Sequence, residues 1–97
     1  MDKFLLIKSM TNRQEIVDVA SIILSAVRSK RGLLTKVSDL SMINRQEFYV
    51  ERFNDLRFYQ VCRILVALAY YDRDLCIKTM KRIIQSIEEK AEQIDNN

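Results

Sequence analysis

The chain has 97 residues, of which 48% are hydrophobic and 30% are charged, and its net charge is +3. This composition is that of one ordinary globular domain, and it excludes a disordered or a membrane-embedded chain. With one glycine and no proline, the sequence lacks the residues on which tight β-turns depend, which excludes a many-stranded β-sandwich or barrel. We therefore expect an all-α protein, a compact single-domain bundle of four to five helices that follows an N-terminal arm over 1–11.

The first helix is predicted over about 12–30. Asn12 and Glu15 form a capping box, in which the asparagine accepts from a free backbone N–H and the glutamate reaches back to the cap. Apolar residues then recur at helical spacing through Ile23 and Val27. Gly32, the single glycine, follows at the position where a left-handed residue ends a helix.

The second and third helices are predicted over about 34–43 and 44–71. The second is short, and its inward positions are Val37, Leu40 and Ile43. The third begins with a repeat of the capping box, at Asn44 and Glu47. Asn54–Asp55 is the point at which this long helix would kink or restart. Its predicted core stripe consists of Phe58, Val61, Leu65 and Leu68.

The last helix is predicted over about 74–94. Its apolar residues recur at alternating intervals of three and four, at Ile77, Met80, Ile84, Ile87, Ala91 and Ile94. This stripe would either form a seam with another chain or pack on the first and third helices. We favour packing within the domain, because the repeat covers fewer than three heptads. The charges run against the helix dipole, with basic residues early in the helix and acidic residues late.

The residues needed for common catalytic chemistry are missing. The sequence has no histidine, no phosphate-binding glycine loop and only two cysteines, Cys62 and Cys76, so it lacks a Ser–His or Cys–His nucleophile and a four-ligand zinc site. Asp72 and Asp74 are close enough to hold a hard cation, but helix caps are the favoured interpretation. We therefore expect a protein that is not an enzyme and that uses no metal or cofactor.

Two features bear on the compartment. Both cysteines lie in apolar helical surroundings, which favours reduced thiols and hence a reducing, cytoplasmic compartment. The densest apolar run, over 61–71, is far shorter than the ~20 residues that span a bilayer. We expect no membrane partner.

One candidate site is basic. Four cations without an intervening acid surround the turn after the first helix, at Arg28, Lys30, Arg31 and Lys36. They could neutralise phosphates of a nucleic acid. The favoured interpretation is that they complement the carboxyl end of the first helix.

The other candidate site combines tyrosine and arginine. On one continuous helix, a single sector of about 80° at 100° per residue would contain Arg45, Tyr49, Arg52, Leu56, Tyr59 and Arg63. Tyrosine and arginine are over-represented among residues that dominate protein interfaces. The alternative is a solvated face on which the tyrosines lie under arginine stems.

The segment Glu15–Leu24 resembles the first helix of the small phage anti-sigma proteins of the AsiA type, over ten of the 97 residues. In that family this helix takes part in dimer and sigma-factor contacts, so the resemblance implies a protein partner from transcription. We expect a small intracellular regulatory protein, an adaptor or inhibitor, that binds another protein and could form a homodimer. The alternative is a nucleic-acid or nucleoprotein component that uses the basic cluster.

Overall fold

The computed structural model describes residues 3–5 and 13–95, and it describes side chains for 3–5 and 19–94. This part of the chain is all-α and contains no strand, which confirms the predicted fold class. Most of the predicted arm over 1–11 and the predicted cap Asn12 lie outside these ranges. The elements are α2 (Arg13–Val27), α3 (Leu33–Ser41), the 3-10 turn η1 (Arg45–Glu47), α4 (Val50–Phe53), α5 (Phe58–Tyr71) and α6 (Arg73–Asp95).

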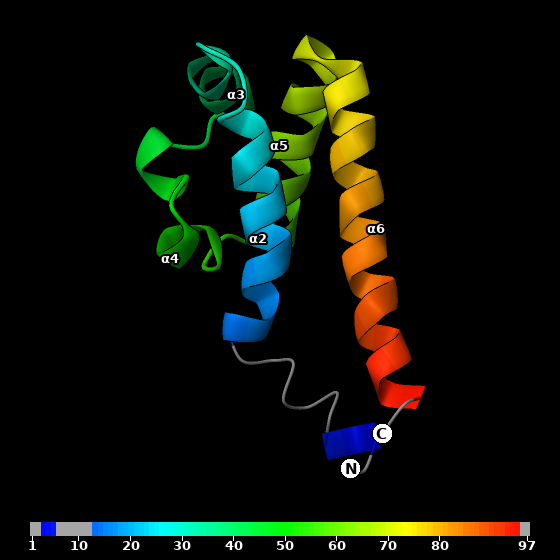
Figure 1. The fold of residues 1–97 in the computed structure, drawn as a ribbon. Coiled ribbons are helices and arrows are strands. Elements are labelled where there is room, and N and C mark those ends of the chain that lie inside the picture. The colour runs from blue at the N-terminus through cyan, green and yellow to red at the C-terminus, as the bar shows by residue number, and fades with distance from the viewer. Residues whose placement is uncertain (1–2, 6–12, 96–97) are drawn as a thin grey trace.

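Three longer helices, α2, α5 and α6, run alongside one another, and the short helices α3 and α4 lie to one side of them (Figure 1). The most extensive packing joins α3 to α5, and α6 to both α2 and α5. Helices α5 and α6 form an antiparallel hairpin, and α6 stands at the edge of the bundle (Figure 1). One face of α6 therefore packs against α2 and α5, while no described helix lies beside its outer flank.

Helix α2 and the turn that follows it agree with the sequence pattern. Ile23 and Val27 are buried in the core, next to Ala20 and Leu24. Gly32 has a φ of +80°, the left-handed conformation that was expected there. Helix α2 ends three residues earlier than predicted, at Val27.

The long helix expected over 44–71 is broken twice. Asn44 does cap a helical turn, since its side chain accepts a hydrogen bond from the Gln46 N–H at 3.0 Å. That turn is only the three-residue η1, however. The chain leaves the helical path at Phe48 and Tyr49, and again over 54–57, which includes the predicted Asn54–Asp55 break.

Burial of Phe48 accounts for the first break. Its side chain is fully buried, and its ring lies 6.4 Å from that of Phe53. The backbone carbonyl of Phe48 accepts a hydrogen bond from the Arg28 guanidinium. That bond offsets the cost of taking this carbonyl out of a helical hydrogen-bond ladder.

The inward face of α5 matches the predicted core stripe in part, since Leu68 is fully buried as expected. Its buried residues are Ile64, Ala67 and Leu68, while Val61 and Leu65 pack at the border of the core. Phe58, expected in the core, is 83% exposed. Leu40 of α3, also expected to face inward, is exposed as well, although Val37 and Ile43 are buried. The two wrong predictions have one cause, since an apolar helix sequence does not say which of its faces meets the rest of the domain.

The bounds of α6 agree with the prediction within one residue, but its inward face does not. The domain buries the face that carries Cys76, Thr79 and Ile83. Thr79 fits there because its hydroxyl donates to the Leu75 carbonyl at 2.7 Å. The apolar stripe, expected to pack within the domain, instead lies on the exposed flank. Four of its members are 38–56% exposed, namely Ile77, Met80, Ile84 and Ile87.

Phe48 and Phe58 provide a matched test of this fold. We expect Phe48→Ala to lower the free energy of unfolding by about 3–5 kcal/mol, because it empties a core site. Phe58→Ala should change it by less than about 0.5 kcal/mol. Urea denaturation followed by circular dichroism measures both changes. A larger loss for Phe58→Ala than for Phe48→Ala would contradict the inward face assigned to α5.

Candidate protein-binding surface

The six residues predicted to share one helical sector are spread over several elements. Arg45 belongs to η1, and Arg52 belongs to α4. Tyr49 and Leu56 lie in the connections that border α4, and only Tyr59 and Arg63 lie on α5. The premise of a single continuous helix is therefore wrong, because the two breaks remove the common axis that would align these side chains.

Three of the four members before α5, namely Tyr49, Arg52 and Leu56, have local partners, whereas Arg45 is exposed. The Arg28 guanidinium stacks over the Tyr49 ring at 5.1 Å from its centre. Arg52 lies 3.8 Å from Glu47, a contact that joins α4 to η1. Leu56 packs against the core. These contacts hold the η1–α4 segment against α2, so they have a structural explanation that needs no outside partner.

Tyr59 and Arg63 stay together on the surface of α5. The Arg63 guanidinium lies 5.3 Å from the centre of the Tyr59 ring, and both side chains are exposed. They are one turn apart, the spacing at which helical side chains meet. This pair is the part of the predicted Tyr/Arg face that the fold preserves.

The pair borders an apolar groove between α3 and α5, with a volume of about 640 Å³. Four of its lining side chains are 69–83% exposed, namely Met42, Phe58, Val66 and Tyr70. The remaining lining residues are Leu40, Ser41, Tyr59, Cys62, Arg63 and Ala67. The floor and walls are thus mostly apolar, and Arg63 supplies the one charged group in the lining.

The end of α3 shapes one wall of the groove. Met42 has a φ of 59°, a left-handed conformation that is uncommon for a residue with a side chain. It ends α3, and its N–H donates to the Asp39 carbonyl at 3.4 Å. The buried Ser38 hydroxyl donates to the Ile43 carbonyl at 2.6 Å and holds the chain in this turn. Met42 is consequently held on the surface rather than in the core.

Phe58, Cys62, Val66 and Tyr70 recur at intervals of four residues, so they form one row along α5. The sequence pattern did not reveal this row because α5 has apolar residues on nearly every face, and Phe58 was assigned to the core stripe instead. The available signal was the absence of a polar face. An apolar helix in a domain of this size must leave some apolar surface uncovered, because a small domain has too little core to enclose it.

Three of the four residues of the basic cluster, Arg28, Lys30 and Lys36, contact other residues of the chain. Lys30 forms an ion pair with Asp72, and the Lys36 ammonium lies 5.8 Å from the centre of the Tyr71 ring. Arg28 is held by Phe48 and Tyr49. Arg31 lies at the same corner and is exposed. Lys30 and Lys36 therefore join the α2–α3 region to α5 and to the start of α6, and Arg28 joins it to the connection between η1 and α4.

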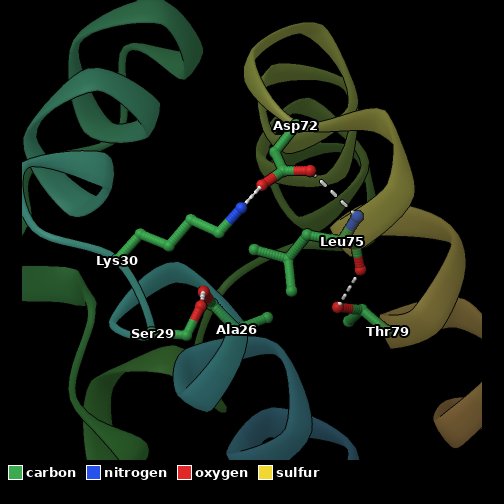
Figure 2. Close-up of polar contacts among 6 residues, drawn as sticks. All are labelled: Ala26, Ser29, Lys30, Asp72, Leu75 and Thr79. Carbon is green, nitrogen blue, oxygen red and sulfur yellow. Dashed lines mark hydrogen bonds and ion pairs between the residues drawn. The ribbon is translucent and has the colours of Figure 1, made fainter.

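Asp72 lies at the centre of that junction (Figure 2). One carboxylate oxygen accepts from Lys30, and the other accepts from the Leu75 N–H at 3.1 Å, so Asp72 caps α6. Asp74 lies in the first turn of α6. The cap agrees with the favoured interpretation of this pair. Among the residues that the structure describes, no three acidic or cysteine side chains are grouped as metal ligands.

The surroundings of Asp72 and Cys76 shift the pKa values of these two groups. The hydrogen bond from Lys30, aided by the Leu75 N–H, lowers the pKa of Asp72 below its ordinary value of 3.8. Burial raises the pKa of the Cys76 thiol, whose sulfur lies 3.5 Å from the Leu65 carbonyl oxygen. Cys62 lies half-buried in the groove, and both cysteines are free. A raised thiol pKa opposes nucleophilic chemistry at Cys76, because the thiolate is the reactive form.

Over the described residues, no helix combines the length and the apolar character needed to cross a membrane. The chain matches no family model, no curated protein and no solved structure. The resemblance of Glu15–Leu24 to the phage anti-sigma proteins therefore stays a prediction.

The Asp72 junction yields a pH-dependent prediction. A depressed folded-state pKa means that the ionised carboxylate stabilises the fold above pH 3.8. This stabilisation is lost as the pH falls through the lower, folded-state pKa. We expect Lys30→Met to raise the Asp72 pKa toward 3.8, because it removes the first cause of the shift. Carbon NMR of the side-chain carboxyl groups measures this pKa. In Arg31→Met, the control, the pKa should stay low; an unchanged pKa in Lys30→Met would contradict the ion pair.

Proposed function

We propose that the protein is a non-enzymatic binding module that accepts an amphipathic helix of another protein in the groove between α3 and α5. The observation that carries this proposal is the exposure of Met42, Phe58, Val66 and Tyr70 along one groove. Contiguous apolar patches of this kind are uncommon on soluble monomers and mark interaction sites. Apolar grooves between helices are a recurrent docking site for the apolar face of a partner helix.

The lining of the groove defines the chemistry of the partner. A partner helix with an apolar stripe at helical spacing would pack against the row of Phe58, Cys62, Val66 and Tyr70. Arg63 lies beside that row, and its guanidinium favours a carboxylate. The expected partner segment is thus an amphipathic helix with an acidic residue at the edge of its apolar face.

The biological role that we propose is regulatory, as a cytoplasmic adaptor or inhibitor. Two features of the sequence support this role. The sequence lacks the common catalytic groups, and Glu15–Leu24 resembles the first helix of the phage anti-sigma proteins. That resemblance makes a protein of the transcription machinery the first class of partner to test.

To test the groove, a display library of amphipathic helical peptides is selected for binding to the purified protein. Val66→Glu places a charge in the groove and should weaken binding of the selected peptides at least about tenfold. Thr35→Glu adds the same charge to an exposed position of α3 outside the groove, and should leave the affinity unchanged. Isothermal titration measures both affinities. Equal affinities for wild type and Val66→Glu would reject the groove as the binding site.

A second pair of variants separates the groove from the broader Tyr/Arg face. Tyr59→Ala should weaken peptide binding, whereas Arg52→Ala should not, because Arg52 is on α4 and does not line the groove. Both variants should melt near the wild-type temperature, since both side chains are exposed. A titration with a nucleic-acid oligonucleotide at rising salt, beside the peptide titration, addresses the alternative of nucleic-acid binding. Affinity for a phosphate backbone falls steeply with salt, and affinity for an apolar groove does not.

A further inference from the structure

The exposed flank of α6 carries an apolar stripe that the domain leaves uncovered. Ile77, Met80, Ile84 and Ile87 are 38–56% exposed. With Ala91 they continue the alternating intervals of three and four over about 21 Å of helix. This spacing aligns side chains along one seam, the pattern by which one helix packs lengthwise on another. The stripe lies outside the groove between α3 and α5, so the proposed function does not account for it.

The charges on the exposed side of α6 are divided along the helix. Lys78 and Lys81 lie in its first half, and Glu88 and Glu92 lie in its second half; all four are exposed. Of these, Lys81 and Glu88 directly border the stripe. The same division makes the helix complementary to a copy of itself that runs in the opposite direction.

From this complementarity we infer that α6 forms an antiparallel homodimer with α6 of a second copy of the chain. Lys81 and Glu88 lie at equal distances along the sequence on either side of the Ile84–Gln85 peptide. A two-fold axis at that point places Lys81 opposite Glu88 of the second copy, and Glu88 opposite its Lys81. The apolar stripes then meet along their full length. A two-fold axis is the commonest symmetry of homo-oligomers, and it produces each contact twice.

The opposite, parallel arrangement is disfavoured by the same residues. In a parallel pair, the positions before Ile77, Ile84 and Ala91 would face the partner's border charges. Two of these positions, Cys76 and Ile83, are buried against the protein's own core, and the third, Lys90, is half-buried. Lys81 and Glu88 are exposed, so their border is the one open to a partner. The interface of one such helix lies at the small end of the range for stable complexes, so a dimer of about micromolar strength is expected.

The test uses charge reversal in the full chain, with sedimentation equilibrium as the measurement. Wild type should dimerise. K81E and E88K should each weaken the dimer about tenfold or more, because each replaces two attractions by two repulsions. The double variant K81E/E88K should dimerise like wild type, and an equal mixture of the two single variants should form a heterodimer. R82E, the control, reverses a charge on the flank of α6 that faces α2, and should not weaken the dimer.

Different results would overturn the dimer itself and its antiparallel register. A wild type that stays monomeric up to about 1 mM would overturn the proposal, as would a K81E variant that dimerises as strongly as wild type. Failure of the double variant to restore the dimer would overturn the antiparallel register. Each variant is checked for an unchanged melting temperature, which the exposure of Lys81 and Glu88 predicts. The test needs no peptide or partner protein, so its result is independent of whether the groove binds a helix.

Discussion

The burial of Phe48 is the constraint on which the arrangement of this protein depends. By entering the core beside Phe53, its side chain draws the backbone out of the helical path, and the Arg28 guanidinium binds the carbonyl that this change frees. After the second break, over 54–57, helix α5 starts separately, with the Arg57 N–H donating to the Gln60 side chain at 2.9 Å. A separate α5 can pack against α3 along one side and α6 along the other. The groove between α3 and α5 follows from that placement.

A second junction lies close to the first, because Lys30 follows Arg28 by two residues in the turn after α2. Asp72 begins α6 and binds Lys30 from the turn after α2, so one carboxylate links the two halves of the chain (Figure 2). Lys36 and Tyr71 meet at the same corner. Cations that would otherwise offer a surface to phosphate are in this way used to join helices. The charge that remains most relevant to recognition is therefore on the helix surfaces, at Arg63 and along α6.

The two proposed surfaces are consequences of one physical limit. A chain of 97 residues with 48% hydrophobic residues has more apolar side chains than its small core can enclose. Much of the surplus is gathered on two flanks, one on α5 and one on α6. Gathered apolar surface is what a soluble domain presents to partners. A groove suits a foreign helix, whereas a self-complementary stripe suits a second copy.

The sequence by itself determined the helical class, the start and end of α6, the left-handed turn at Gly32 and the caps at Asn44 and Asp72. These features depend on local chemistry: side chains that bind nearby backbone groups, and a residue that tolerates a positive φ. The sequence also predicted the break at Asn54–Asp55, but only the tertiary structure decided which face of each apolar helix is buried and that the chain leaves the helical path at Phe48 and Tyr49. Phe58 and the α6 stripe have core-like spacing but lie on the surface, since burial depends on which neighbours are present. Periodicity specifies a face of a helix, but only packing specifies what covers it.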